Sequence, residues 1–450
     1  MQKPSMDPPE SRPPATQAVR PALRTSFAWL LWSGVFYGLA QWSILIVMTR
    51  ALSVEDVGTY TLALAISAPI MMFSGLQLRT LQATDSLSIF EFADFYTLRL
   101  LLSTASVPVV AMTASLFSRT GHAVLVCTLV AVAKAVESQS DAVHGYFQRH
   151  EAIRLIAYSV MLKAALSALV MTVVLILTNS LVIAVTSEVL AFATIFFAFD
   201  LRRLRGLPET PRRILVVPWA ESRRRIRRLA RQGFPLGLSA GASSLRMNVP
   251  RYFLQAQAGA AALGFFGAVS YLNIALGRVV LALNNAAAAR LSDSFYSNPA
   301  QFKRLFWRVV GVIALLGIVA IAVSALFGTE LLHIFYGQAY SRYSLAFAIS
   351  ITAAAAGGVA STFELALTVA RRLDIQAAAG LAALLTGSLA SALLVPKWGV
   401  SGGACALAAI HFVHLAIIAG AATIEIRRRG PRPVSLSNGD KNVPEESTAR

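Results

Sequence analysis

The sequence predicts an all-α integral membrane protein of about twelve transmembrane helices, in two six-helix lobes around a central cavity. The first observation is composition: 56% of the 450 residues are hydrophobic and 14% are charged, with a mean hydropathy of +0.62. Such a chain is too apolar for the surface of a soluble domain. The second is that apolar runs of about 20 residues, enough to cross roughly 30 Å of hydrocarbon, recur from Phe27 onward. The third is one long arginine-rich connection between two equal sets of runs.

Hydropathy over windows of about 19 residues locates the expected spans. The helices are expected near residues 27–48, 57–77, 95–117, 122–143, 153–177, 180–199, 233–254, 262–289, 306–327, 343–368, 374–395 and 401–425. The domains follow as a disordered cytoplasmic N-terminus (1–24), an N-lobe (25–200), an arginine-rich cytoplasmic linker (201–232), a C-lobe (233–426) and a cytoplasmic C-terminal tail (427–450). The first run is too long for the core of a cleavable signal peptide, and no small-residue cleavage site closes it.

Basic residues are distributed unevenly over the expected loops. With twelve spans, one side of the membrane receives nearly all of them, and the other side holds only Arg50, Arg119, Arg342 and Lys397. Because cytoplasmic loops carry the excess of Lys and Arg, we expect a multi-pass membrane protein with both termini in the cytoplasm. The net charge of +18 then reflects topology, and we expect no binding to nucleic acid.

The arginines of the expected linker allow two interpretations. They are Arg202, Arg203, Arg205, Arg212, Arg213, Arg223, Arg224, Arg225, Arg227, Arg228 and Arg231. They fix the topology and rest on anionic lipid headgroups, or they form a docking site for cytoplasmic enzymes. A weak internal repeat supports the division at this linker, because Arg50 precedes Gly58-Thr59-Tyr60 and Arg251 precedes Gly264-Phe265-Phe266. Repeated bundles hold their substrate at the interface between repeats, so we expect the site between the lobes.

Several charged residues fall within the expected spans. The bases are Arg99, Lys134, Lys163, Arg246, Arg251 and Arg278, and the acids are Glu137, Asp141, Glu188 and Glu364. A charge at the centre of a lipid-facing helix costs about 2.5–3.5 kcal/mol, so these side chains should face protein or water. Arg99 and Arg251 lie near helix ends, where they can extend to the interface. The excess of bases favours an anionic substrate, and guanidinium groups match the geometry of phosphate oxygens.

Helical faces group some of these charges with small polar residues. Lys134, Glu137 and Asp141 share one face of the fourth expected helix. This face is either an internal ion pair in a packed bundle or the wall of a polar cavity. In the seventh expected helix, Ser239 and Arg246 share one face. In the eighth, Arg278 lies at the edge of the face that contains Asn273.

Motifs for catalysis, cofactors or metals are not found in the sequence. It contains no nucleotide-binding loop, nucleophile elbow or zinc motif. Cys127 and Cys405 lie in apolar segments, and His411 and His414 have no acidic residue within a turn. We expect these histidines to be satisfied core residues, and we expect no metal, no cofactor and no enzymatic activity.

Three stretches of the chain resemble one family. They are Arg50-Ala-Leu-Ser-Val-Glu-Asp-Val-Gly58-Thr-Tyr60 with Gly75-Leu-Gln-Leu-Arg79, then Pro250-Arg251-Tyr252 with Leu263-Gly264-Phe265-Phe266 and Ala289-Arg290-Leu291, and Trp398-Gly399-Val400-Ser401-Gly402-Gly403-Ala404. They resemble the bacterial oligosaccharide flippases, the Wzx-type polysaccharide biosynthesis and export proteins of the multidrug/oligosaccharidyl-lipid/polysaccharide (MOP) superfamily. The resemblance covers about residues 25–425. It implies a two-lobed bundle with alternating access and a polyprenyl-diphosphate-linked oligosaccharide as cargo, destined for surface polysaccharides such as lipopolysaccharide or exopolysaccharide.

With this cargo, the buried charges receive candidate roles. The expected substrate-binding residues are Arg246, Arg278, Lys163, Lys134 and Asn273, the first three on the diphosphate. The carboxylates Glu137, Asp141, Glu188 and Glu364 either carry protons or a coupling cation, or only offset the bases. Further partners are membrane lipids and polysaccharide assembly proteins.

Two other functions remain open from the sequence. A drug or small-cation antiporter of the same superfamily should have a cavity that is acidic overall, whereas here the bases outnumber the acids. A membrane-embedded polysaccharide polymerase or ligase needs a substantial outer loop, and the longest expected one, Gly328 to Arg342, is short.

Overall fold

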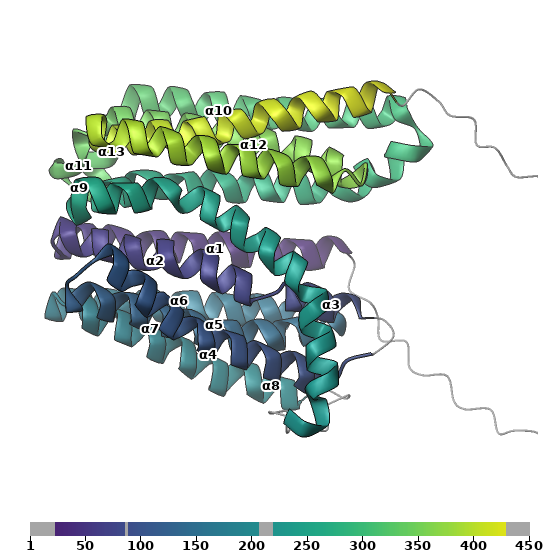
Figure 1. Cartoon of the computed structure of the whole chain (residues 1–450), viewed down its shortest axis with the longest axis horizontal. Helices are drawn as coiled ribbons and strands as arrows, with labels where there is room; N and C mark the ends of the chain where they lie inside the picture. Colours follow the sequence, from purple (N-terminus) through teal and green to yellow (C-terminus); the bar gives the residue numbers. More distant parts are fainter. Residues whose placement is uncertain (1–22, 86–88, 207–218, 429–450) are drawn as a thin grey trace, which may run out of the picture.

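The computed structural model describes residues 23–85, 89–206 and 219–428, which are helical apart from short connections. Figure 1 shows two groups of long, roughly parallel helices, an N-lobe from the first part of the chain and a C-lobe from the second. The start of the first helix and the end of the last lie at the same end of the bundle (right in Figure 1). We call this end the terminal end and the other the opposite end.

The helices of the N-lobe follow one another in the chain with short connections. They are α1 (Leu23–Ala51), α2 (Val54–Ser74), α3 (Leu78–Thr84), α4 (Phe92–Phe117), α5 (Gly121–Arg149), α6 (Ile153–Thr178), α7 (Leu181–Ile195), the π-helix η1 (Phe196–Asp200) and α8 (Leu201–Arg205). The C-lobe is formed by α9 (Trp219–Ser297), α10 (Pro299–Tyr336), α11 (Gln338–Ser341), α12 (Ser344–Val369) and α13 (Leu373–Arg428).

Two helices, α9 and α13, are interrupted, and each therefore forms two spans. Gly259 has φ +81° and ψ 176°, and Gly399 has φ +52° and ψ −122°. Residues with a Cβ rarely adopt such angles, whereas glycine does so without a steric penalty. The described ranges contain ten helices long and apolar enough to cross a membrane, and the two breaks raise the number of spans to twelve. The predicted twelve-helix, two-lobed fold is confirmed.

Local sequence signals define several helix ends. At the start of α2, the side chain of Ser53 accepts a hydrogen bond from the backbone N–H of Asp56 (3.1 Å). At the start of α4, the backbone N–H of Glu91 donates to Asp94 (3.1 Å). Such caps satisfy backbone groups that have no partner within the helix. At the end of α6, Asn179 adopts the left-handed conformation typical of helix C-termini.

Part of the expected linker is helical and packs on the N-lobe. Residues 219–232 form the first turns of α9, while 207–218 lie outside the described residues, as do 1–22 and 429–450. Ile226 and Leu229 are buried in a cluster with Leu78 and Phe95. In Figure 1 this part of α9 crosses the N-lobe near α3 before the chain continues into the C-lobe. The second half of the linker is therefore an amphipathic helix with one covered face.

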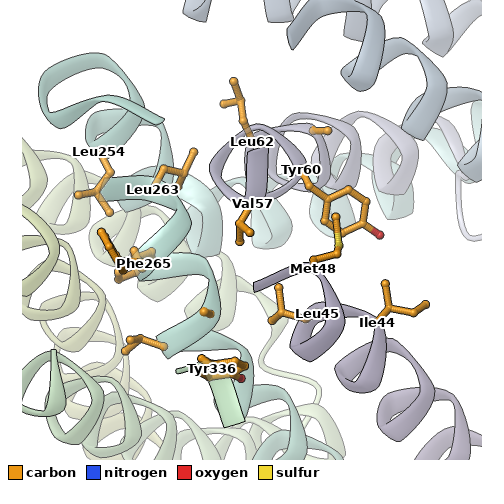
Figure 2. Close-up of a cluster of buried hydrophobic side chains, with 14 of the residues drawn as sticks. Ile44, Leu45, Met48, Val57, Tyr60, Leu62, Leu254, Leu263, Phe265 and Tyr336 are labelled. Carbon is orange, nitrogen blue, oxygen red and sulfur yellow. The ribbon is translucent and has the colours of Figure 1, made fainter. Parts of the chain in front are cut away.

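The two lobes pack closely at the opposite end. Figure 2 shows apolar side chains of α1 and α2, among them Leu45 and Val57, near side chains of α9 such as Leu263. A Cβ on Gly58 would overlap the carbonyl oxygen of Ala260, so only glycine permits this approach. The indole N–H of Trp42 donates to the hydroxyl of Tyr336 on α10 (2.9 Å). The lobes are thus joined at this end by packing of small residues, a contact typical of membrane helices.

Candidate functional site

A polar cluster lies at mid-depth in the N-lobe. Lys134 Nζ on α5 is 2.8 Å from Glu137 Oε2, one turn further along the same helix. The hydroxyl of Tyr37 on α1 donates to Glu137 Oε1 (3.2 Å). The side chains of Lys134 and Glu137 are 28% and 29% exposed. The predicted Lys–Glu pair therefore exists, and it still presents polar surface at the depth where a lipid-facing helix would be apolar.

Glu188 adds a buried carboxylate to this cluster. It lies on α7, is only 3% exposed, and interacts electrostatically with Lys134 and Glu137. Tyr271 on α9 also interacts electrostatically with Lys134, and with Arg278 one to two turns further along α9. The N-lobe cluster therefore faces the part of α9 that carries the predicted residues Asn273 and Arg278.

The C-lobe contains a hydrogen-bonded chain of three residues from three helices. Arg246 on α9 is 2.7 Å from His414 Nδ1 on α13, and His414 Nε2 is 2.7 Å from Glu364 Oε1 on α12. Arginine only donates, so Nδ1 of His414 must accept, and its proton lies on Nε2, from which it is donated to Glu364. The imidazole is therefore neutral, and it connects the guanidinium to the carboxylate.

Donor and acceptor capacity remains unused beside this chain. Nε of Arg246 and Oδ1 of Asn273 are buried and have no hydrogen-bond partner among the residues that the structure describes. Arg278 is exposed and forms no ion pair with any described residue. Unsatisfied buried polar atoms are rare in proteins and call for an explanation, such as a ligand or water. Arg246, Arg278 and Asn273 are thus available to a polar ligand.

Lys163 lies elsewhere, in the interior of the N-lobe. Its Nζ is 2.7 Å from Asp200 Oδ2 in η1 and donates to Ser159 Oγ at 3.1 Å. His144 Nε2 is 2.9 Å from the same Ser159 oxygen. The expectation that Lys163 contacts a diphosphate stays a prediction, and in this structure an internal carboxylate already holds its ammonium group. The sequence did not indicate this partner, because Asp200 lies just past the sixth expected span, 180–199.

Asp141 lies among bases, as in the second of its two expected roles. Its carboxylate lies 3.5 Å from Arg79 and 3.6 Å from Arg99, near the terminal end. Arg99 is 6% exposed and donates to the carbonyl oxygen of Gly75 (3.1 Å), so it does not extend to the interface as expected. Two guanidinium groups hold this carboxylate in a structural network.

Arg251 departs from its expectation in the same way. Its guanidinium donates to Asn248 and to Ser270 (3.4 Å) and thereby joins the two parts of α9 on either side of Gly259. His411 lies against Gly357, where a Cβ would overlap its imidazole ring. These two residues therefore make contacts within the C-lobe.

Three residues in these clusters were not identified from the sequence. Tyr37 and Tyr271 lie in apolar runs without a charged residue within one helical turn, and His414 was expected to be a core residue. Their partners come from other helices, so no spacing along the chain could reveal them. Within the described ranges, no group of three His, Cys, Asp or Glu residues is placed to hold a metal ion.

Comparison with known proteins identifies the family. Residues 23–295, more than half of the chain, match the family described as "Polysaccharide biosynthesis protein". The capsular polysaccharide biosynthesis protein CapF of Staphylococcus aureus is 21% identical over 393 residues, which is 87% of this chain and 96% of CapF.

Solved structures share the fold at low sequence identity. The lipid II flippase MurJ, in an inward closed conformation, has a TM-score of 0.68 at 11% identity, over 90% of this chain and 89% of MurJ. An inward-facing multidrug resistance MATE family transporter of the MOP superfamily has a TM-score of 0.56 at 14% identity, over 92% of this chain and 96% of the transporter. A MOP superfamily transporter from Pyrococcus furiosus has a TM-score of 0.59 at 13% identity, over 91% of this chain and 97% of that transporter. The family resemblance expected from the sequence is thus confirmed, and the chain belongs to the polysaccharide biosynthesis protein family, with the fold of the MOP superfamily transporters.

Proposed function

We propose that this protein is a flippase that moves a polyprenyl-diphosphate-linked oligosaccharide across the bacterial inner membrane, with both termini in the cytoplasm. The observation that carries the proposal is the pair Arg246 and Arg278 on α9, each well inside an expected span, with Arg246 directed toward α12 and α13 of the C-lobe and Arg278 exposed. One has a buried Nε without a partner, and the other has no acidic partner in the described part of the chain. The family match to polysaccharide biosynthesis proteins supports the same cargo.

A diphosphate suits these two arginines because guanidinium groups bind phosphate oxygens through paired, charge-assisted hydrogen bonds. Lys134 contributes less than its position suggests, since Glu137 neutralises it at 2.8 Å. The unpartnered Oδ1 of Asn273 and the hydroxyl groups of Tyr37 and Tyr271 suit the hydroxyl groups of a sugar. The lipid tail remains outside the protein, in the bilayer.

Alternating access follows from the way the lobes meet. Close packing at Gly58 and Ala260 joins them at the opposite end, so a substrate at mid-depth would enter from the terminal end. Separation of this contact would open the site to the other side of the membrane. Glu364 is joined to Arg246 through His414. Binding of the substrate to Arg246 would therefore change the surroundings of the Glu364 carboxylate, which could take up a proton.

A cation antiporter is the second candidate, and Glu188 is the observation that favours it. A carboxylate that is 3% exposed at membrane depth is a typical site for a proton or cation in a transporter. Against this function, Lys134 interacts electrostatically with Glu188 and competes with any external cation.

Deletion of the gene distinguishes the two candidates. For the flippase, lipid-linked oligosaccharide should accumulate in the cytoplasmic leaflet and surface polysaccharide should be lost. Normal surface polysaccharide combined with reduced drug resistance would overturn the flippase proposal and support the antiporter.

A further inference from the structure

Four exposed arginines surround a hollow on the first turns of α9. Arg224, Arg227, Arg228 and Arg231, together with Gln232, line a space of ≈ 360 Å³. Their spacing of i, i+3, i+4 and i+7 places the four guanidinium groups on one face of the helix. None of the four forms an ion pair with an acidic residue that the structure describes. Like charges one turn apart repel each other, and an anion in the hollow would remove this repulsion.

The neighbouring residues hold this face in a fixed direction. Arg225, on the other side of the helix, lies 2.8 Å from Asp94 and 3.5 Å from Glu91 of the N-lobe. Ile226 and Leu229 are 2% and 0% exposed against α3 and α4. Because the helix cannot rotate without breaking these contacts, the backbone that carries the four arginines is preorganised. Preorganised groups bind a ligand with a smaller loss of conformational freedom.

The hollow lies where α9 enters the apolar part of the bundle. Phe234, Leu238 and Leu245 follow on the same side of the helix and are exposed by 52%, 53% and 39%. Apolar side chains that remain exposed in a membrane protein face lipid, and Phe234 is within one helical turn of Arg231. An occupant that inserts a hydrocarbon chain beside these residues can therefore place its headgroup among the arginines.

A polar row connects the hollow to the candidate site. Arg228, Gln232, Ser239, Ser243 and Arg246 lie along one strip of α9, at intervals of three, four or seven residues. Gln232, Ser239 and Ser243 are exposed. A headgroup that leaves the arginines could move along hydrogen-bonding groups to Arg246 while its tail stays beside Phe234 and Leu238.

We propose that this hollow captures the diphosphate of a polyprenyl-diphosphate lipid at the membrane surface, before the headgroup moves along α9 to Arg246. The inference rests on the proposed flippase function, because it gives that cargo an entry point. Adjacent phosphates present more anionic oxygens to the four guanidinium groups than the single phosphate of an ordinary phospholipid. The diphosphate should therefore be preferred over a phospholipid headgroup.

Binding to the full-length protein in phosphatidylcholine nanodiscs tests the proposal. The probes are a polyprenyl diphosphate without sugar and, separately, phosphatidylglycerol, with binding measured by native mass spectrometry. The R246Q/R278Q background removes the central arginines, so that residual binding reports on the hollow. When R224Q/R227Q/R231Q are introduced into this background, binding of the diphosphate should weaken by at least about tenfold. The reason is that each basic group near a headgroup contributes to the binding free energy. The matched control K303Q/R304Q/R308Q changes three exposed charges at the start of α10 and should leave binding unchanged.

Two results of this assay would overturn the capture site. If the α10 control loses as much diphosphate binding as R224Q/R227Q/R231Q, the binding reflects only general attraction between charges. If phosphatidylglycerol binds as tightly as the polyprenyl diphosphate, the hollow is an ordinary phospholipid site. A transport assay in the otherwise wild-type protein separates this proposal from the flippase function. R224Q/R227Q/R231Q should raise the substrate concentration for half-maximal transport without lowering the maximal rate, and a lower maximal rate with unchanged half-saturation would contradict capture. If the wild type binds the diphosphate lipid in the hollow but transports none, the flippase proposal fails while the capture site stands.

Discussion

Lys163 and Asp200 form an ion pair in the interior of the N-lobe, with Nζ 2.7 Å from Oδ2 and side chains that are 3% and 0% exposed. The pair joins α6 to the π-helix η1, and His144 lies beside it, with Nε2 3.8 Å from Asp200 Oδ1. A π-helix turn shifts the side-chain register of a helix by one residue. Here η1 ends at the carboxylate that neutralises the lysine.

Asp200→Asn should destabilise the protein strongly. The substitution leaves the ammonium group of Lys163 buried without a counter-charge, and loss of one partner of such a pair costs about 3–5 kcal/mol. Thermal unfolding in detergent should show a lower Tm, and the double variant Lys163→Met, Asp200→Leu should recover much of the loss. Asp374→Asn, at a carboxylate that is 67% exposed, is the matched control and should change little. An unchanged Tm with lost transport would return Lys163 to the substrate path.

His414→Phe should reduce transport more than stability. The ring keeps much of the buried volume, but Arg246 loses the acceptor at 2.7 Å and Glu364 loses its donor. Loss of a hydrogen-bond partner from a buried group costs about 1–3 kcal/mol, and the freed guanidinium would pair with a different group. The rate of translocation by the reconstituted protein and its Tm are the two measurements. His122→Phe, at a side chain that is 49% exposed, is the control, and equal effects of both substitutions would exclude a positioning role for His414.

Gly58→Ala should weaken the contact between the lobes at the opposite end. A Cβ at this position would overlap the carbonyl oxygen of Ala260, whereas one at Gly38 in α1 meets no atom within 4 Å. Overpacking typically costs about 1–3 kcal/mol, while alanine for glycine in an open helical position stabilises by about 0.5–1 kcal/mol. The Tm should therefore fall for Gly58→Ala and rise slightly for Gly38→Ala. Equal Tm changes would show that the lobes do not approach this closely in the membrane.

Much of the fold could be predicted because a bilayer imposes a simple requirement. Each span needs about 20 apolar residues, and hydropathy therefore located twelve spans correctly. The break at Gly399 was expected between two of these spans, because the stretch Trp398 to Ala404 resembles a family turn. The helical start of α9 was not expected, because hydropathy cannot recognise an arginine-rich helix whose buried face contains little more than Ile226 and Leu229.

The candidate site could be predicted only in part, because periodicity gives the face of a helix but not its neighbour. Lys134 and Glu137 pair within one helix, and their spacing made this pair one of the two interpretations of that face. Lys163 and Asp200 are 37 residues apart, and Arg246 and His414 are 168 apart. Such contacts depend on how helices pack against one another. The sequence therefore identified the charged residues but could not distinguish those that are neutralised internally from those that remain available.

Arg278→Gln is expected to separate function from stability most clearly. The guanidinium is exposed and has no acidic partner in the described ranges, so its loss should change the free energy of unfolding by no more than about 0.5 kcal/mol. A hydrogen bond to a charged group contributes about 1.5–3 kcal/mol, and about 1.4 kcal/mol corresponds to a factor of ten. Translocation of lipid-linked oligosaccharide should therefore fall at least about tenfold. Arg278→Lys should be intermediate because it keeps the charge but loses the paired donors, and Arg304→Gln on α10 should transport normally. A stably inserted Arg278→Gln protein with the wild-type rate would remove this arginine from the diphosphate site and leave Arg246 as its main cation.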